Sequence, residues 1–305
     1  MTRLLSLALL ALAAGALAAD LDPSADGPFA VGVTTVTFVD AARSRTLVTE
    51  VWYPADAAGR DTTPHHGRWR LVLVAHGNCG FRTNYEYLTV PLASRGFLVA
   101  APDFPGINKT DCDNQVSPGD IVGDPPHDLV FLRAAFHDRS GPAGALASAV
   151  RGQHAGLVGH SLGGLAVVNA ALADPDLRAV VTLAPLAATP QGQAFVSLRP
   201  RRPVLVVVGT ADTTLPPQLF AQPFFAALLP PAFLVSIVGG THSGLTDMDA
   251  SLSPAALARE EMLARRYTVA FLERYIGRHR QEGRFLTPED AAAEGADVQL
   301  TARPG

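Results

Sequence analysis

Residues 157–164 read LVGHSLGG, and no other stretch of the sequence says more about the fold. Two apolar residues lead into a G-x-S-x-G pattern, and a helix-forming segment begins directly after the serine. In an elbow between a strand and a helix, the serine is held in a strained conformation with its Oγ exposed above the sheet. Glycines on both sides lack a Cβ atom, so the strand and the helix can approach closely. The stretch predicts Ser161 as a nucleophile, but so short a pattern also arises by chance, and the rest of the chain has to support it.

Short apolar runs alternate with helical segments through most of the chain. The first two runs alternate partly between apolar and polar residues and suggest an antiparallel start, whereas the later ones are continuous and typical of strands buried on both faces of a parallel sheet. This alternation favours an α/β fold with about eight mostly parallel strands and helices on both faces. The runs are Thr35–Val39, Thr46–Tyr53, Leu71–Ala75, Phe97–Ala101, Leu157–Val158, Ala179–Leu183, Val204–Val208 and Phe233–Val238, and the helical segments are Tyr85–Ser94, Asp128–Phe136, Leu162–Ala173, Pro217–Leu229 and Pro254–Ile276.

The first residues have the pattern of a targeting segment. Arg3 precedes an apolar stretch over residues 4–12, and small residues follow at 16–18. A positive charge, an apolar core and a small-x-small cleavage site are typical of a secretory signal peptide, here expected over 1–18. The alternative is an uncleaved N-terminal anchor, for which the apolar stretch is short. We therefore expect an exported protein, secreted or periplasmic, without stable membrane insertion.

The last predicted helix has the best-defined ends. Ser253 is expected to cap its first turn, Pro254 fits the first helical position, and Gly277 fits the position just past its end. From residue 281 onward the chain is polar and rich in Ala, Glu and Asp, so we expect a loosely packed tail over 281–305. No internal repeat or linker divides the remainder, which predicts one catalytic domain over 19–280.

Composition narrows the range of partners. The 305-residue chain is 48% hydrophobic, enough for a sizeable core, and its formal net charge is −4. No basic run suggests nucleic acid and no acidic tail suggests a charged partner, and we expect a monomer. The two cysteines, Cys79 and Cys112, have two interpretations: a disulfide formed in an oxidising compartment, or a reactive thiol.

A serine hydroxyl is a poor nucleophile until a base takes its proton and a carboxylate orients that base. Two residues downstream of Ser161 fit these roles in the order Ser, acid, His. Asp212 follows the apolar run that ends at Val208, and His242 follows the run that ends at Val238. Both stand just past the carboxyl end of a predicted strand, where open α/β sheets bind ligands. The order and the positions predict a catalytic triad of Ser161, Asp212 and His242.

Each candidate also has a plainer interpretation. Asp212 alone fits a turn residue, and His242 alone fits a surface-loop histidine. Among the competing histidines, His160 adjoins the nucleophile but is expected to point elsewhere on the turn, and His76 follows an earlier strand. The histidine pair at 65–66 is more typical of a loop than of a metal site, because no carboxylate cluster accompanies it. We expect no metal.

The tetrahedral intermediate of acyl transfer needs two backbone N–H donors for its oxyanion. Leu162, the residue after the nucleophile, is expected to supply one of them. The other is expected from the loop after the run 71–75, where residues 76–80 read HGNCG. The N–H of Asn78 is the first choice and that of Cys79 the second. The alternative is a glycine-rich turn without a catalytic role.

Together these motifs resemble the α/β-hydrolase superfamily, and within it the platelet-activating-factor acetylhydrolase and dienelactone-hydrolase-like group, with secreted cutinase-like polyester hydrolases as near relatives. The resemblance implies an α/β-hydrolase fold and hydrolysis of carboxylic esters without a metal or organic cofactor. Dienelactone hydrolases use a cysteine nucleophile, so the serine argues against a dienelactone substrate. The motifs are VWYP at 51–54, HGNCG at 76–80, LASRGF at 92–97, APDFPG at 101–106, GHSLGG at 159–164, GTAD at 209–212 and GTH at 240–242.

The resemblance also bears on the surroundings of the site. The strands that precede Cys79 and Cys112 are neighbours in this fold, so a disulfide between them would brace the oxyanion loop. The segment 185–203, where many lipases insert a lid, has the length of a plain crossover and predicts no large cap domain. Phe81 is expected to line the acyl or alcohol pocket, or else to pack on the following helix, and the segment 104–126 is expected at the pocket rim.

The expected function is an exported serine hydrolase that cleaves carboxylic esters through an acyl-enzyme, with short-to-medium acyl esters as small-molecule substrates. A lipase or a polyester hydrolase of the cutinase or PET type, acting on lipid or polymer esters, is the first alternative. An amidase or peptidase on the same fold is another, although no charged pocket favours it. A non-catalytic binding module is the last, and the complete triad argues against it.

Overall fold

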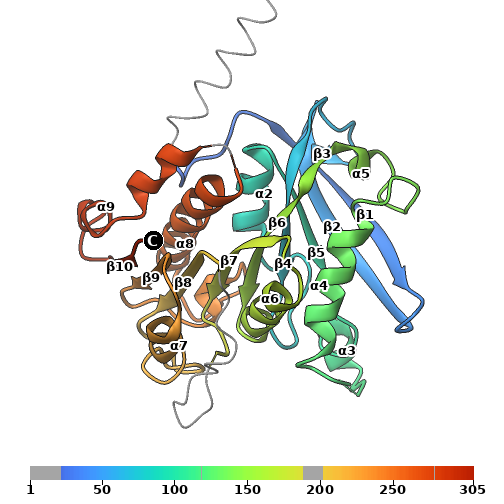
Figure 1. Cartoon of the computed structure of the whole chain (residues 1–305). Helices are drawn as coiled ribbons and strands as arrows, with labels where there is room; N and C mark the ends of the chain where they lie inside the picture. The colour runs from blue at the N-terminus through green and yellow to red at the C-terminus, as the bar shows by residue number, and fades with distance from the viewer. Residues whose placement is uncertain (1–21, 118, 188–201, 278) are drawn as a thin grey trace, which may run out of the picture.

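The computed structural model describes residues 22–117, 119–187, 202–277 and 279–305. The strands in these ranges are β1 (Ala30–Asp40), β2 (Arg45–Ala55), β3 (Gly59–Arg60), β4 (Trp69–Ala75), β5 (Phe97–Pro102), β6 (Val150–His160), β7 (Leu177–Leu183), β8 (Val204–Gly209), β9 (Ala232–Ile237) and β10 (Val298–Arg303). They form one sheet in the order β10-β9-β8-β7-β6-β4-β5-β2-β1-β3 (Figure 1). The predicted α/β-hydrolase fold is confirmed.

Parallel pairing fills the centre of the sheet, from β5 through β4, β6, β7 and β8 to β9. Antiparallel pairs occur on either side of this centre, where β2 joins β5 and β1, and β10 joins β9. Each of the eight predicted runs corresponds to a strand. Ten strands are found in the described residues instead of about eight, because the two-residue β3 pairs with β1 and because the C-terminal segment adds β10.

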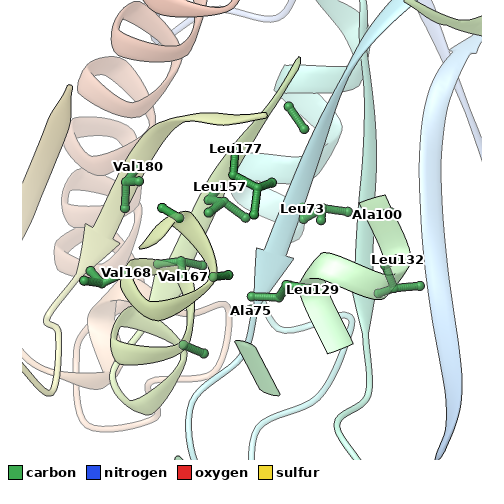
Figure 2. Packing of buried hydrophobic residues seen from close by; sticks show 14 of the residues in the cluster. Leu73, Ala75, Ala100, Leu129, Leu132, Leu157, Val167, Val168, Leu177 and Val180 are labelled. Atoms are coloured by element: carbon green, nitrogen blue, oxygen red, sulfur yellow. The ribbon is translucent and has the colours of Figure 1, made fainter. Parts of the chain in front are cut away.

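Helices cover both faces of this sheet. They and the short 3-10 turns are α2 (Glu86–Ser94), α3 (Lys109–Asp113), α4 (Asp124–Ala135), α5 (Ala145–Ala149), α6 (Leu162–Ala173), α7 (Ala221–Ala227), η2 (Ser243–Leu245), α8 (Pro254–Tyr275), η3 (Arg280–Phe285) and α9 (Pro288–Ala293). α4 and α6 pack together on one face, and α2 and α8 pack together on the other (Figure 1). Figure 2 shows Leu129 of α4 and Val167 of α6 near Leu73 of β4 and Leu157 of β6. This fully buried layer fixes the strand ends from which the site is built.

The expectation of a loosely packed tail over 281–305 is wrong. η3, α9 and β10 follow one another there, and β10 pairs along the whole length of β9. Val298 and Leu300 of β10 are buried, whereas Gln299 and Thr301 are exposed, which is the period of a half-buried strand. The overall polar composition hid this signal, because only two apolar residues carry it.

The predicted ends of α8 are confirmed. Pro254 is its first residue, and the Oγ of Ser253 accepts the N–H of Ala256 at 3.2 Å. At the other end, the N–H of Gly277 donates to the carbonyl of Leu272 at 2.9 Å. These contacts satisfy backbone groups that a helix end otherwise leaves without a partner.

Two predictions lie outside the described residues: the signal peptide over 1–18 and most of the crossover over 185–203. None of the helices in the described ranges has the length and apolar character of a membrane span.

Candidate active site

Ser161 stands between β6 and α6 in a left-handed backbone conformation, with φ 56° and ψ −121°. Non-glycine residues rarely adopt such angles, so this turn stores strain. The neighbouring glycines permit it: a Cβ on Gly159 would collide with the Gly163 carbonyl, and a Cβ on Gly163 would collide with the Ala75 carbonyl. The N–H of Ser161 donates to the carbonyl of Leu183 at 2.9 Å. The elbow thus holds Ser161 at the carboxyl edge of the parallel strands.

Asp212 lies just past β8, and its side chain is fully buried. Its Oδ1 accepts the backbone N–H groups of Thr214 and Leu215 at 2.9 and 2.8 Å. Its Oδ2 is 2.8 Å from Nδ1 of His242. Because the turn fixes one carboxylate oxygen, the other can orient the imidazole with Nδ1–H towards Asp212 and Nε2 on the opposite side.

Ser161 and His242 share one cavity of about 230 Å³. Its walls come from the loop after β4, the start of α2, the elbow and the segment after β9. The structure therefore brings the three predicted triad residues together, with Asp212 reaching the cavity through its bond to His242. The lining residues are Gly77, Asn78, Cys79, Gly80, Asn84, Tyr85, His160, Ser161, His242, Ser243, Thr246 and Met248.

Two expectations about the pocket differ from this lining. Phe81 is not part of it; the guanidinium of Arg82 lies over the Phe81 ring, 4.4 Å from its centroid. The described residues of the segment 104–126 do not line it either, whereas Thr246 and Met248 do. Sequence reasoning missed these two residues because the short turn after His242 carries no motif.

The loop His76–Gly80, called here the 76–80 loop, faces the elbow. The N–H of Cys79 donates to the carbonyl of Ile107 at 2.8 Å, which excludes this second choice as an oxyanion donor. In the described part of the chain no group accepts the N–H of Asn78, which lines the cavity beside Ser161. Leu162 opens α6, where N–H groups have no acceptor within the helix. The two first-choice donors are therefore both available next to Ser161.

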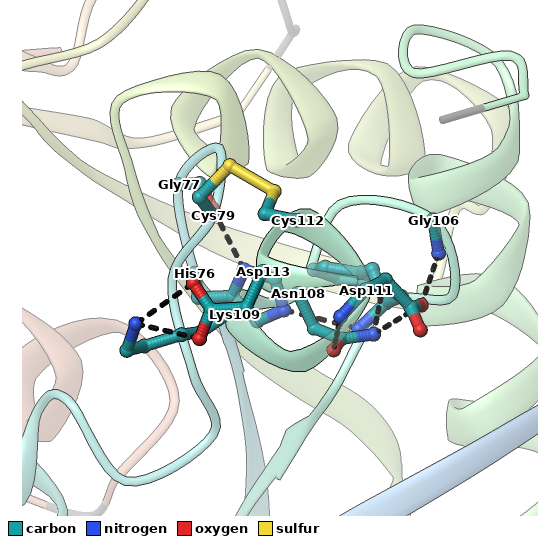
Figure 3. The surroundings of a disulfide bond; sticks show 10 residues. His76, Gly77, Cys79, Gly106, Asn108, Lys109, Asp111, Cys112 and Asp113 are labelled. Atoms are coloured by element: carbon teal, nitrogen blue, oxygen red, sulfur yellow. Dashed lines mark hydrogen bonds and ion pairs between the residues drawn. A yellow bond between two sulfur atoms is a disulfide. The ribbon is translucent and has the colours of Figure 1, made fainter. Parts of the chain in front are cut away.

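A disulfide joins Cys79 of the 76–80 loop to Cys112 of α3 (Figure 3). Of the two interpretations left open by the sequence, the structure has the disulfide and not the free thiol. Two backbone hydrogen bonds of 2.8 Å run beside it, from Cys79 N–H to the Ile107 carbonyl and from Lys109 N–H to the Gly80 carbonyl. The loop is thus tied to the segment around α3 by one covalent and two hydrogen bonds.

His76 anchors the other side of the 76–80 loop. Its buried ring contacts the carbonyl of Gly77 through Nδ1 at 2.7 Å and accepts the N–H of Phe104 through Nε2 at 3.0 Å. Burial lowers the pKa of His76, so the ring is neutral. A neutral ring with its hydrogen on Nδ1 satisfies both bonds. His76 therefore supports the loop, and both of its ring nitrogens are already engaged.

His160 was expected from the sequence to point away from the site, and this expectation is wrong. Its Nε2 lies 3.0 Å from the carbonyl oxygen of His242, and the two imidazole centroids are 4.7 Å apart. Its Nδ1 lies 3.2 Å from the hydroxyl of Tyr85, which also lines the cavity. In the sequence, only the position of His160 next to Ser161 in the G-x-S-x-G motif pointed to these contacts. Tyr85 gave none, since an aromatic residue at the start of a helix is usually core.

Glu260 of α8 stands behind the turn that presents His242. Both oxygens of its carboxylate accept the N–H of Thr241, at 3.0 and 3.1 Å. Burial, together with the nearby carboxylates of Asp249 and Asp212, raises the pKa of Glu260 to about 7. The turn is therefore held by a buried acid that titrates near neutral pH.

Comparison with known proteins agrees with this architecture. The chain is similar to a bis(hydroxyethyl) terephthalate hydrolase from Streptomyces coelicolor, with 25% identity over 270 residues that cover 86% of this chain and 72% of that protein. It is also similar to cutinase 2 from Thermobifida cellulosilytica, with 25% identity over 242 residues that cover 77% of this chain and 80% of that protein. Cutinase 1 from the same organism is 22% identical over 266 residues, which cover 87% of this chain and 86% of that protein. The model of the PET hydrolase-like family matches residues 17–302, and the chain belongs to that family.

Proposed function

We propose that this carboxylic ester hydrolase is an exported serine enzyme that cleaves polyesters and their small ester fragments through an acyl-enzyme. One observation carries the proposal: the strained Ser161 opens into the same cavity as His242, whose Nδ1 is held by the buried Asp212. Such an arrangement suits a nucleophile, a base and an orienting carboxylate.

In the first half of the reaction, Ser161 Oγ attacks the ester carbonyl carbon while Nε2 of His242 takes the hydroxyl proton. The carbonyl oxygen becomes an oxyanion, which the N–H groups of Asn78 and Leu162 stabilise. The intermediate collapses, the bond to the leaving alcohol breaks, and His242 gives its proton to that alkoxide. Asp212 keeps its hydrogen bond to Nδ1 of His242 and stabilises the imidazolium throughout.

In the second half, a water molecule attacks the acyl carbon while His242 takes one of its protons. The same two N–H groups stabilise the second oxyanion. When this intermediate collapses, the proton returns from His242 to Ser161 Oγ and the carboxylic acid leaves. The free enzyme is restored without a metal or an organic cofactor.

The substrate class rests on two observations. The relatives named as a terephthalate ester hydrolase and cutinases favour the polyester alternative over the short acyl esters first expected. In addition, the apolar side chain of Met248 lines the cavity and is 59% exposed. Exposed apolar groups beside a cavity suit the surface of an apolar polymer.

Export is proposed from the signal-peptide pattern over 1–18. The disulfide between Cys79 and Cys112 supports it, because such bonds persist in oxidising compartments. We further propose that the enzyme acts as a monomer on its ester substrates and has no nucleic-acid partner, since the chain carries no basic run.

The proposal is tested with purified mature protein and its Ser161→Ala variant. Hydrolysis is measured on p-nitrophenyl esters from acetate to palmitate, on bis(hydroxyethyl) terephthalate, on a matched amide and on an amorphous polyester film. Film loss and terephthalate ester cleavage that vanish in Ser161→Ala are the expected result. Turnover of the acetate ester alone would favour a small-ester hydrolase. A preference for long acyl chains would indicate a lipase, and faster cleavage of the amide than of the matched ester would indicate an amidase. Full turnover in Ser161→Ala, or no reaction of the wild-type protein with a fluorophosphonate, would remove Ser161 from the mechanism.

A further inference from the structure

Tyr85 and His160 connect two parts of the site, the 76–80 loop and the segment at His242, between which the described residues form no direct backbone hydrogen bond. The N–H of Gly77, in the 76–80 loop, donates to the Tyr85 hydroxyl at 3.3 Å. That hydroxyl lies 3.2 Å from Nδ1 of His160, and Nε2 of His160 lies 3.0 Å from the carbonyl oxygen of His242. Tyr85 is 2% exposed and His160 is 6% exposed, so the chain of contacts is shielded from water.

The direction of these three hydrogen bonds is fixed at both ends. A backbone N–H only donates, and a backbone carbonyl only accepts. Since the His242 carbonyl accepts, the hydrogen of the His160 ring is on Nε2. Burial, and then the neighbouring His242, lower the pKa of His160 to about 3, so Nδ1 carries no proton at neutral pH and accepts the Tyr85 O–H. The Tyr85 oxygen is then free to accept from Gly77, and no alternative arrangement of hydrogens satisfies all four groups.

The two ends of this series of hydrogen bonds lie next to the two groups that the proposed chemistry requires, an oxyanion donor and a base. Gly77 directly precedes Asn78, the proposed oxyanion donor, and the other side of Gly77 is held by His76. His242 is held at its ring by Asp212 and at its backbone by His160. Ser161 lies between these two ends, in the residue next to His160.

We propose that Tyr85 and His160 are positioning residues, which hold the 76–80 loop and the backbone of His242 at a fixed separation on either side of Ser161. The inference rests on the proposed serine mechanism and deepens it. Misplacing an oxyanion donor or a base lowers the rate of the chemical step far more than it lowers substrate binding. A purely structural role for these buried side chains predicts loss of stability without a selective loss of kcat.

The test uses Tyr85→Phe, which keeps the ring and removes the hydroxyl, leaving Gly77 N–H and His160 Nδ1 without their partner. Tyr53→Phe is the matched control, because Tyr53 of β2 is also buried and its hydroxyl donates to the carbonyl of Thr62, just past β3, at 2.8 Å and outside the cavity. For Tyr85→Phe we expect kcat on a p-nitrophenyl ester to fall about 10- to 100-fold with KM within about threefold. Tyr53→Phe should keep the wild-type kcat.

A second pair of variants separates the role of His160 from its bulk. Glutamine at 160 can place an amide N–H near the position of Nε2 and donate to the His242 carbonyl, whereas leucine cannot. We expect His160→Gln to retain several-fold more kcat than His160→Leu, with both normalised to the folded fraction by active-site titration. Equal kcat in the two variants would overturn the inference.

The rate at which a fluorophosphonate phosphonylates Ser161 gives a readout that needs no ester substrate. Slower phosphonylation in Tyr85→Phe than in Tyr53→Phe supports the positioning role. Wild-type rates in Tyr85→Phe, or losses that follow the melting temperature alike in both variants, overturn it. By contrast, ester turnover that survives in Ser161→Ala would contradict the proposed function itself, so the two failures are distinguishable.

Discussion

The carboxylate of Asp212 bridges a backbone turn and the ring of His242. One oxygen accepts the N–H groups of Thr214 and Leu215, and the other lies 2.8 Å from Nδ1 of His242. The turn therefore determines which of the two carboxylate oxygens contacts the imidazole. This relationship makes the orientation of the proposed base a property of the strand end and its first turn.

Asp212→Asn should lower kcat by about 10³- to 10⁴-fold. The asparagine oxygen can still accept the two backbone N–H groups of the turn, which leaves its amide nitrogen facing His242. That nitrogen donates, so Nδ1 of His242 must accept and the ring hydrogen moves to Nε2, where it blocks removal of the Ser161 proton. Steady-state kinetics with the melting temperature as a control measures this. A kcat within tenfold of wild type would contradict the role of Asp212.

Replacing both Cys79 and Cys112 by Ala should cost more stability than activity. The bond closes a loop with a sequence separation of 33 residues, for which chain entropy predicts a loss of about 3–4 kcal/mol in the free energy of unfolding. The two backbone hydrogen bonds beside it remain and hold the 76–80 loop, so kcat should fall by less than about tenfold. Urea unfolding and ester kinetics measure the two effects. A collapse of kcat in a fully folded variant would show that the backbone bonds alone do not hold the loop.

Glu260→Gln should stabilise the protein at alkaline pH and not at acid pH. The folded protein keeps the Glu260 proton up to about pH 7, whereas the unfolded chain releases it near the ordinary pKa of 4.5. Stability contributed by this group is therefore present at low pH and is lost as pH rises through about 7. The gain in the free energy of unfolding should be near zero at pH 4.5 and on the order of 2 kcal/mol at pH 8. Urea titrations across this range test it, and a variant less stable than wild type at pH 8 would refute it.

Gly77→Ala should separate the 76–80 loop from the elbow. A Cβ at this position would lie 2.9 Å from the Cβ of Ser161 and 3.3 Å from Nδ1 of His160. Since neither neighbour is a flexible side-chain end, the loop has to move, and its proposed oxyanion donor moves with it. We expect kcat to fall about 10- to 100-fold. The kinetics are compared with the melting temperature, and unchanged kcat in a stable variant would show that the loop tolerates the shift.

The parts of the molecule that sequence reasoning predicted are those with local signals. Ser161, Asp212 and His242 each follow an apolar run that ends at the edge of the sheet. The structure places Ser161 and His242 in one cavity, with Asp212 bonded to His242 behind it; their catalytic roles stay predictions. The prediction that His160 points away from the site was wrong. Its direction depends on how the elbow turns at Ser161, where φ is 56°, and residue types alone do not indicate this angle. β10 was missed because two buried residues within a polar segment do not outweigh its composition. Met248 lines the cavity because of tertiary packing, which no local sequence pattern indicates.

The pairing of β10 with β9 has a consequence for synthesis of the protein. α8, η3 and α9 separate β10 from β9 along the chain, so β9 is synthesised well before the strand that pairs with its outer edge. Until β10 is made, the outer edge of β9 carries unpaired N–H and C=O groups, which are a template for pairing with other chains. Domains begin to fold from the N-terminus while the rest is still being made, so the nascent protein passes through a stage with a nearly complete sheet and an open edge. A chain cut before β10 keeps that edge open and is exposed to aggregation and proteolysis, although Ser161, Asp212 and His242 all precede the cut.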